Sequence, residues 1–283
     1  MFDKNIISHN FHELDEFIPE LKKNFIKADP FPHIVIKNFF NESFLNKILE
    51  DFPNLNNASG TEKYNNENEF KLANNRFNSF PQSLKNIFKF LNSSDFLKFL
   101  QQISSINEKL EPDLELNGGG LHEIKRGGVL KIHTDFNKHP SNGKDRRVNL
   151  LLYLNKNWLD SYGGCLELWD QEMTKCVKQI KPEFNTMVIL NTNDFSNHGH
   201  PDPLNCPINL SRKSIATYYF SKGRPQHEIN SNIFKNKTYF KNRVGFKNDT
   251  SENKEKFKNF FRSFKIYQKL KNFEKKYLRK KNK

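Results

Sequence analysis

The middle of the chain contains short apolar stretches separated by segments that include glycine, proline or asparagine. Five of them alternate between apolar and polar positions or are continuously apolar, as β-strands are; they span residues 127–132, 146–155, 163–169, 184–190 and 212–220. Several short strands separated by turn residues are typical of an all-β sandwich or barrel. We therefore expect a β-sheet core in this part of the chain.

The N-terminal part follows a different pattern. Residues 1–28 and 83–106 predict helices, Asn41 begins another helix, and residues 33–36 predict a single strand. The phenylalanines of 83–106 are expected to pack in the core. Residues 54–75 are polar, and we expect them to form an irregular loop over the mouth of the functional site. The whole pattern predicts a mainly β protein with flanking helices, in the α+β class.

Charge is distributed unevenly along the chain. The formal net charge is +14, but residues 1–220 carry 26 Lys and Arg against 27 Asp and Glu, whereas residues 221–283 carry 20 against 5. From Lys254 onward, aromatic residues and leucine recur every three or four positions among lysines and arginines, which predicts a basic amphipathic helix.

Three interpretations of this basic segment remain open. It packs its aromatic stripe on the body of the protein, it lies on an anionic membrane surface, or it attracts a polyanionic partner or an acidic substrate. Nothing in the sequence resembles a nucleic-acid recognition module, so nucleic acid is a poor candidate partner.

The cysteines and the N-terminus bear on the cellular location. Cys165, Cys176 and Cys206 are odd in number and lack metal-ligand spacing, so we expect reduced thiols. The N-terminus lacks an apolar signal core, and no apolar run approaches the ~20 residues that span a bilayer. We therefore expect a cytoplasmic protein without a transmembrane segment.

Candidate chemistry is concentrated in His133, Asp135, His198 and Arg212. Residues two positions apart on a strand point to the same side, so His133 and Asp135 can act together. With a distant second histidine they can hold one face of an Fe(II) ion and leave the other coordination positions open. Arg212 adds a planar fork of donors that can grip a carboxylate.

Strand parity tests the assignment of Arg212. If Arg212 points inward, so do Ser214 and Ala216, and these small side chains leave room for a bound dicarboxylate. An inward Lys213 would instead bring Ile215 to the same side and crowd the pocket. The second histidine is less constrained, because His198 and His200 share parity and either could reach a metal.

The order of these pieces resembles the Fe(II)/2-oxoglutarate-dependent dioxygenases, in the branch similar to prolyl 4-hydroxylases. The resemblance covers roughly residues 29–221 and is strongest from Leu121 onward. It implies a double-stranded β-helix core of the jelly-roll or cupin-like type. It implies Fe(II), 2-oxoglutarate and O2 as cofactor and cosubstrates, with ascorbate as a reductant.

The family pattern also implies individual roles. The metal ligands would be His133, Asp135 and His198, since the pattern His-Gly-x-Pro favours His198 over His200, which would lie nearby or be a solvated loop residue. Arg212 and Tyr153 would bind the distal carboxylate of 2-oxoglutarate, and Leu151 and Leu166 would line its pocket. The 14 residues from His198 to Arg212 exceed the shortest spacing in the family, so residues 203–207 are expected to bulge out between two strands.

The implied activity is hydroxylation of an unactivated C–H bond with release of succinate and CO2, on a prolyl residue, another amino-acid residue or a small molecule. Asp135 argues against halogenation, because related halogenases lack this carboxylate. The alternatives are a cupin-like metal protein of different chemistry, which Arg212 and Tyr153 argue against, and an inactive binding module, which the intact ligand set argues against. The expected organisation is an N-terminal helical segment (1–28), the dioxygenase domain (29–222) and a basic tail (223–283).

Overall fold

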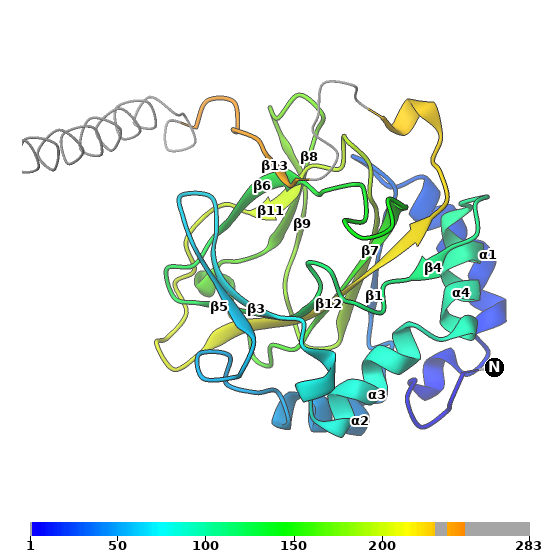
Figure 1. Cartoon of the computed structure of the whole chain (residues 1–283), viewed down its shortest axis with the longest axis horizontal. Coiled ribbons are helices and arrows are strands. Elements are labelled where there is room, and N and C mark those ends of the chain that lie inside the picture. Colours follow the sequence, from blue (N-terminus) through cyan, green and yellow to red (C-terminus); the bar gives the residue numbers. More distant parts are fainter. Residues whose placement is uncertain (1, 230–236, 247–283) are drawn as a thin grey trace, which may run out of the picture. The chain divides into compact units, whose positions relative to one another are not determined.

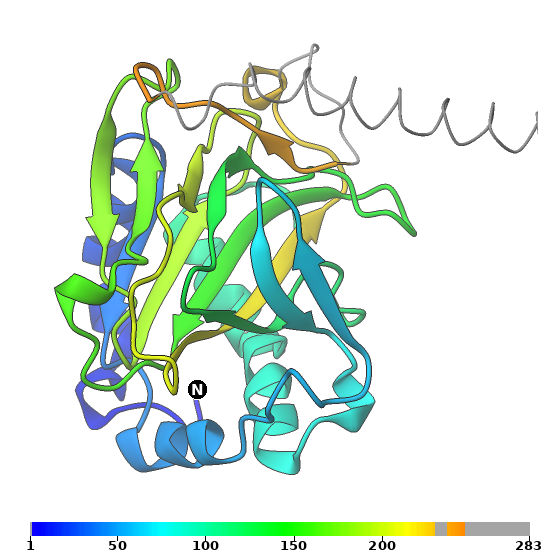
Figure 2. The ribbon, with the colours of Figure 1, turned by 90° about the vertical axis from the view of Figure 1, so that its left-hand side faces the viewer.

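Two antiparallel β-sheets form the core of the computed structural model, which describes residues 2–229 and 237–246 (Figures 1 and 2). The larger sheet has eight strands: β1 (His33–Lys37), β10 (Thr186–Asn191), β7 (Asp145–Tyr153), β12 (Ser211–Ser221), β5 (Gly120–Lys125), β3 (Phe70–Asn74) and β2 (Thr61–Asn65) in spatial order, with β4 (Glu111–Pro112) beside β12. The smaller sheet has five: β13 (Tyr239–Phe240), β6 (Leu130–Thr134), β11 (His198–His200), β8 (Leu166–Trp169) and β9 (Cys176–Ile180). Between β5 and β12 the chain crosses repeatedly from one sheet to the other, and the predicted double-stranded β-helix is confirmed.

Helices lie outside the sheets, as the sequence predicts (Figure 1). The α-helices are α1 (Leu14–Ile26), α2 (Glu42–Glu50), α3 (Gln82–Leu91) and α4 (Ser94–Ser104), and short 3-10 helices cover His9–Phe11, Phe77–Ser79, Asp160–Tyr162 and Gln226–Glu228. Asn41 begins α2, because its side chain accepts hydrogen bonds from the backbone N–H groups of Ser43 (2.9 Å) and Phe44 (3.3 Å). The helical region predicted at residues 83–106 forms two helices, α3 and α4. Their phenylalanines Phe88 and Phe96 are fully buried.

Successive side chains on the central strands point in turn toward a core that faces the helices and toward an internal cavity. On β7, Leu150 and Leu152 belong to the same buried cluster as the helix phenylalanines, whereas Leu151 and Tyr153 line the cavity. This two-sided burial explains why the second half of β7, residues 150–153, is continuously apolar in sequence rather than alternating.

Strand β12 follows the predicted parity. Arg212 and Ser214 line the cavity, while Ile215 and Tyr219 pack in the helix-facing cluster. Tyr219 also donates a hydrogen bond from its hydroxyl to the backbone oxygen of Leu91 (2.9 Å), which ties β12 to the end of α3. The helices thereby fix the strand that carries Arg212.

The expected irregular loop at residues 54–75 is wrong. Strands β2 and β3 form a hairpin there, and β3 pairs with β5 at the edge of the larger sheet. The side chain of Asn66 stabilises the turn by accepting hydrogen bonds from the N–H groups of Asn68 (2.9 Å) and Glu69 (3.1 Å). Backbone pairing at a sheet edge needs no apolar alternation, so the polar sequence hid these strands. The hairpin does border the cavity, through Tyr64 and Lys71 among others.

Two further boundaries differ from expectation. Residues 1–28 are not helical throughout, because α1 begins only at Leu14 and Ile7 pairs instead with Phe40 in an isolated bridge. After β12, Arg224 donates from Nε to Asp145 Oδ1 (2.9 Å), and β13 pairs with β6. The first residues of the predicted tail, from residue 223 to β13, therefore belong to the body of the protein.

The chain divides into two compact units, Met1–Lys241 and Asn242–Lys283. Of the second unit only residues 242–246 are described, and there Phe246 donates from its N–H to the backbone oxygen of Arg243 (3.3 Å). The amphipathic helix predicted from Lys254 onward lies outside the described residues. Within the described part, no helix has the length and apolar character needed to cross a membrane.

Candidate active site

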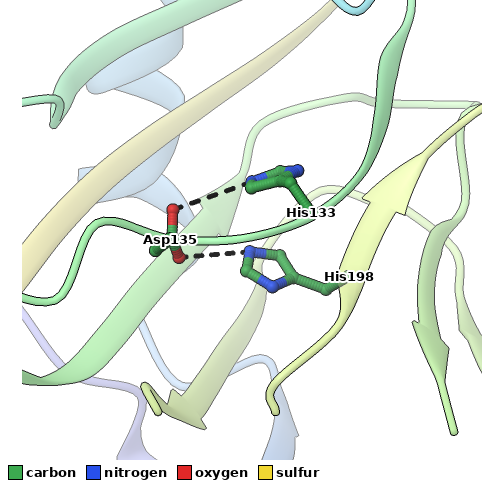
Figure 3. A group of neighbouring side chains, drawn as sticks. All are labelled: His133, Asp135 and His198. Carbon is green, nitrogen blue, oxygen red and sulfur yellow. Dashed lines mark ion pairs between the residues drawn. The ribbon is translucent and has the colours of Figure 1, made fainter. Parts of the chain in front are cut away.

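Three side chains in or next to the smaller sheet converge in the cavity. His133 lies on β6, Asp135 follows directly after that strand, and His198 begins β11, where it pairs with His133 across the ladder (Figure 3). The possible ligand atoms of these three residues all lie within 4.8 Å of one another. Asp135 Oδ1 is 3.7 Å from His133 Nε2, and Asp135 Oδ2 is 3.4 Å from His198 Nε2. The arrangement fits a metal ion bound on one face.

Both histidines are oriented by the backbone. Nδ1 of His133 lies 2.8 Å from the oxygen of Lys131, and Nδ1 of His198 lies 2.9 Å from the oxygen of Ser196. A carbonyl can only accept, so each Nδ1 carries the proton and each Nε2 keeps a lone pair for a metal. Burial lowers the pKa of His198 to about 4, which favours the neutral form that ligates.

Arg146 and Asn149 hold the carboxylate of Asp135. Asn149 Nδ2 donates to Asp135 Oδ2 (2.5 Å), Arg146 Nη2 lies 3.3 Å from the same oxygen, and Arg146 Nε donates to Asn149 Oδ1 (2.7 Å). The guanidinium is stacked over the ring of Tyr218, 3.3 Å from its centroid. Burial alone would raise the pKa of Asp135, but the charge of Arg146 and the nearby histidines outweigh it and hold that pKa well below its usual value. The carboxylate is therefore ionised and oriented.

Arg212 lies in the same cavity as the three clustered residues. Its Nε donates to the backbone oxygen of Gly164 (2.8 Å) and its Nη2 donates to the hydroxyl of Tyr153 (3.1 Å). Arg212 is only 5% exposed, yet no carboxylate among the described residues lies within ion-pair distance of it. A buried and uncompensated guanidinium is costly, so this position favours an anionic ligand.

Gly164 makes that position available. Its φ is +75°, and a Cβ built on it would lie 2.4 Å from Leu204 Cδ2 and 3.1 Å from Arg212 Cδ. A side chain at this position would displace the guanidinium, so glycine is required by both conformation and space.

The cavity that joins these groups has a volume of about 440 Å³. Leu151 and Leu166 line it, as predicted for the cosubstrate pocket. The hairpin β2–β3 borders it, and so do Lys237 and Thr238 immediately before β13. All the residues singled out in the sequence for the metal and for a carboxylate are thus brought to one cavity. Their individual roles remain proposals.

The sequence left the choice between His198 and His200 open, and the structure groups only His198 with His133 and Asp135. His200 is nevertheless not a solvated loop residue, because it is 2% exposed and lines the cavity. The loop after it leaves the sheets as predicted, and its residues Leu204 and Cys206 are buried against Trp158.

Sequence reasoning missed Arg146 and Asn149 as site residues. The available signal was a pair of consecutive arginines at the start of an apolar strand, where a charged side chain needs a buried partner. Asn149 shares strand parity with the predicted Leu151 and Tyr153, so the same parity argument would have placed it in the cavity.

Comparisons with known proteins agree with this geometry. Residues 119–220 match the family model described as the 2OG-Fe(II) oxygenase superfamily, and this segment includes every predicted site residue. Prolyl 3-hydroxylase OGFOD1 from Xenopus laevis is 28% identical over 177 residues, which are 60% of this chain and 31% of that protein. The chain therefore spans about a third of the length of this curated relative.

Solved structures give the same fold. A prolyl-4-hydroxylase from Pseudomonas putida superposes with a TM-score of 0.53 at 12% identity, over 73% of this chain and 100% of that one. A prolyl hydroxylase from Trichoplax adhaerens, solved with a peptide fragment of the hypoxia inducible factor oxygen degradation domain, has a TM-score of 0.53 at 16% identity, over 74% and 92%. At these identities the likeness concerns the fold alone.

Proposed function

We propose that the protein is a 2OG-Fe(II) oxygenase, since residues 119–220 match the model of that superfamily, and that it hydroxylates a C–H bond of a peptidyl substrate, with a prolyl residue as the favoured target. Fe(II), 2-oxoglutarate and O2 are the cofactor and cosubstrates of this family. One oxygen atom of O2 enters the substrate and the other enters succinate, while CO2 leaves from C1 of 2-oxoglutarate. The use of ascorbate as a reductant stays a prediction.

The observation that carries this proposal is the combination of two features in one cavity. His133, Asp135 and His198 would hold Fe(II), which supplies the oxidising chemistry when bound. Arg212, with Tyr153 beside it, would hold the distal carboxylate of 2-oxoglutarate. A cupin-like metal protein of other chemistry would have no use for an unpaired buried arginine, and an inactive binding module would have no use for the oriented ligand set.

A prolyl target is supported by two facts. The curated relative is named as a prolyl 3-hydroxylase. The cavity is also lined by the aromatic residues Tyr64, Phe136 and Tyr218, whose rings suit contact with an apolar pyrrolidine ring.

Mass spectrometry of peptides from a treated lysate tests the proposal. We expect a proline-containing peptide to gain one oxygen atom only when the protein, Fe(II) and 2-oxoglutarate are all present, with succinate formed in equal amount. Reactions without 2-oxoglutarate and reactions without iron are the controls. Amino-acid analysis of the product distinguishes 3-hydroxyproline from 4-hydroxyproline. Failure of the iron-loaded protein to bind 2-oxoglutarate would overturn the function, whereas a product on a residue other than proline would overturn only the target.

We also propose that the basic segment captures an anionic partner or surface and takes no part in the chemistry. Deleting residues 247–283 removes most of the excess positive charge and leaves the body, including β13, complete. The truncated protein should bind iron and 2-oxoglutarate as the full chain does. Its binding to vesicles of anionic lipid should fall, since such attraction is screened over a Debye length of about 8 Å at physiological ionic strength.

Measurement of vesicle binding at two salt concentrations checks this prediction, with vesicles of neutral lipid as the control. Loss of iron or 2-oxoglutarate binding in the truncated protein would instead mean that the segment supports the body. The cytoplasmic location predicted from the sequence stays a prediction.

A further inference from the structure

His200 is a buried side chain of the cavity that the proposed function leaves without a role. It is 2% exposed and lines the cavity together with Arg212 and His133. Neither of its ring nitrogens has a hydrogen-bond partner among the described residues. A buried imidazole without any partner costs free energy, and this cost is removed when a ligand supplies the missing hydrogen bond.

The surroundings of His200 differ from those of the two clustered histidines. His133 and His198 each have Nδ1 against a backbone oxygen, as metal-ligating histidines usually do. His200 has no such contact, and its ring is not part of the group within 4.8 Å. It is therefore placed to contact a ligand of the cavity rather than the metal.

His200 and Arg212 line the same cavity, and a single loop separates the strands that carry them. Strand β11 begins at His198 and ends at His200, and the following loop returns at Ser211 to begin β12, which carries Arg212. Lys71 lines this cavity too. Two cationic side chains therefore border the cavity that His200 lines, and such surroundings suit an anionic ligand oxygen.

Gly199 allows this arrangement. A Cβ at Gly199 would lie 2.7 Å from the backbone oxygens of both Leu130 and Lys131. The register of the β11–β6 ladder shifts between His198 and His200, where this close approach occurs. Glycine thus lets two histidines, spaced by one residue, enter the cavity from one short strand.

We propose that His200 donates an N–H hydrogen bond to the carboxylate of 2-oxoglutarate that Arg212 holds, and so acts as a further binding residue for the cosubstrate. The inference rests on the proposed function, since it assumes that 2-oxoglutarate occupies the cavity. One ring nitrogen of an imidazole supplies the N–H for this bond, and the other is left to contact the substrate or water. Because the acceptor is charged, this hydrogen bond should increase the affinity for 2-oxoglutarate roughly ten- to a hundredfold.

The test compares His200→Leu with His200→Gln. Anaerobic titration of the Fe(II)-loaded protein, followed by calorimetry, gives the dissociation constant of 2-oxoglutarate without any turnover. We expect roughly ten- to a hundredfold weaker binding for His200→Leu, partial recovery for His200→Gln because an amide retains a donor, and unchanged iron affinity in both. His9→Leu, which removes an exposed histidine on the first 3-10 helix, is the matched control and should change nothing.

Binding of a second ligand, 2-oxobutyrate, tests whether His200 contacts the distal carboxylate. 2-Oxobutyrate keeps the keto acid and lacks the distal carboxylate, so wild type and His200→Leu should bind it equally. Thermal unfolding adds a separate readout, because leucine should leave the ligand-free protein as stable as wild type or more so, while the increase in Tm caused by 2-oxoglutarate becomes smaller.

The outcomes are distinguishable. Equal 2-oxoglutarate affinity for wild type and His200→Leu overturns the role of His200, and so does an equal loss of affinity for 2-oxobutyrate and 2-oxoglutarate. Loss of iron binding in both His200 variants would show instead that His200 supports the metal site. If the wild-type protein itself does not bind 2-oxoglutarate in the presence of Fe(II), the proposed function fails and not only this inference.

Discussion

Asp135→Ala is expected to abolish both Fe(II) binding and iron-dependent formation of succinate. Asp135 is the one anionic member of the proposed ligand set, and among the described residues its carboxylate is the one that forms an ion pair with the buried Arg146, at 3.3 Å. Removing it leaves a guanidinium facing the position of a divalent cation, so the cation is repelled as well as deprived of a ligand. The loss of iron affinity should therefore be larger than for a substitution that only moves a ligand atom.

Two further variants make this measurement sharp. Asp135→Asn keeps the shape and the hydrogen bond to Asn149 but removes the charge, and it should lose most of the iron affinity while remaining folded. Asp160→Ala removes a well-exposed carboxylate that forms an ion pair with Lys181 at the surface, and this variant should bind iron as wild type does. Equilibrium titration with Fe(II) under anaerobic conditions checks all three. Succinate production by Asp135→Ala at the wild-type rate would disprove the ligand assignment.

The second large effect is expected for Arg212→Ala. A charge-assisted contact contributes about 1.5–3 kcal/mol, so 2-oxoglutarate should bind roughly ten- to 150-fold more weakly. Iron binding should be preserved, because Arg212 contacts Gly164 and Tyr153 rather than the metal cluster. Tyr153→Phe removes one neutral hydrogen bond and should cost less, about 0.5–1.5 kcal/mol.

The neighbouring Lys213 provides the control for Arg212. Its backbone contacts Leu154 and Asn155 at the end of β7, and its ammonium lies 5.5 Å from the ring of Phe52, outside the cavity. Lys213→Ala should therefore leave the dissociation constant of 2-oxoglutarate unchanged. A larger effect from Lys213→Ala than from Arg212→Ala would mean that the strand faces the other way in solution.

Features with a local cause were predictable from the sequence. The apolar run of β7, the polar cap of α2 at Asn41 and the parity of β12 all depend on neighbouring residues, and the structure has each of them. The resemblance of the motif order then placed the predicted ligands in one cavity. A polar hairpin such as β2–β3 was not predictable in this way, because its strands are defined by backbone pairing with β5 rather than by an apolar face.

Features that depend on contacts between distant residues were also missed. Arg146 and Asn149 on β7 contact Asp135 at the end of β6. The sequence spacing between these residues does not predict that they meet. The burial of His200 could not be read from a loop-like His-Gly-His-Pro sequence, since it depends on the bulged pairing with β6. The attachment of β13 to β6 was missed because two residues carry too little pattern to predict a strand.

That short attachment affects how the site is assembled. Apart from an isolated bridge between its Leu130 and Glu69, strand β6, which carries His133, pairs with β11 and β13 among the described strands. Phe240 of β13 places its ring 5.5 Å from the ring of His133. Both partners come from much later in the chain than β6, so each pairing must first close a long loop and lose the corresponding chain entropy. The ligand strand is therefore expected to become fixed late in folding. Iron would then be captured by a nearly completed fold rather than act as the nucleus around which the fold condenses.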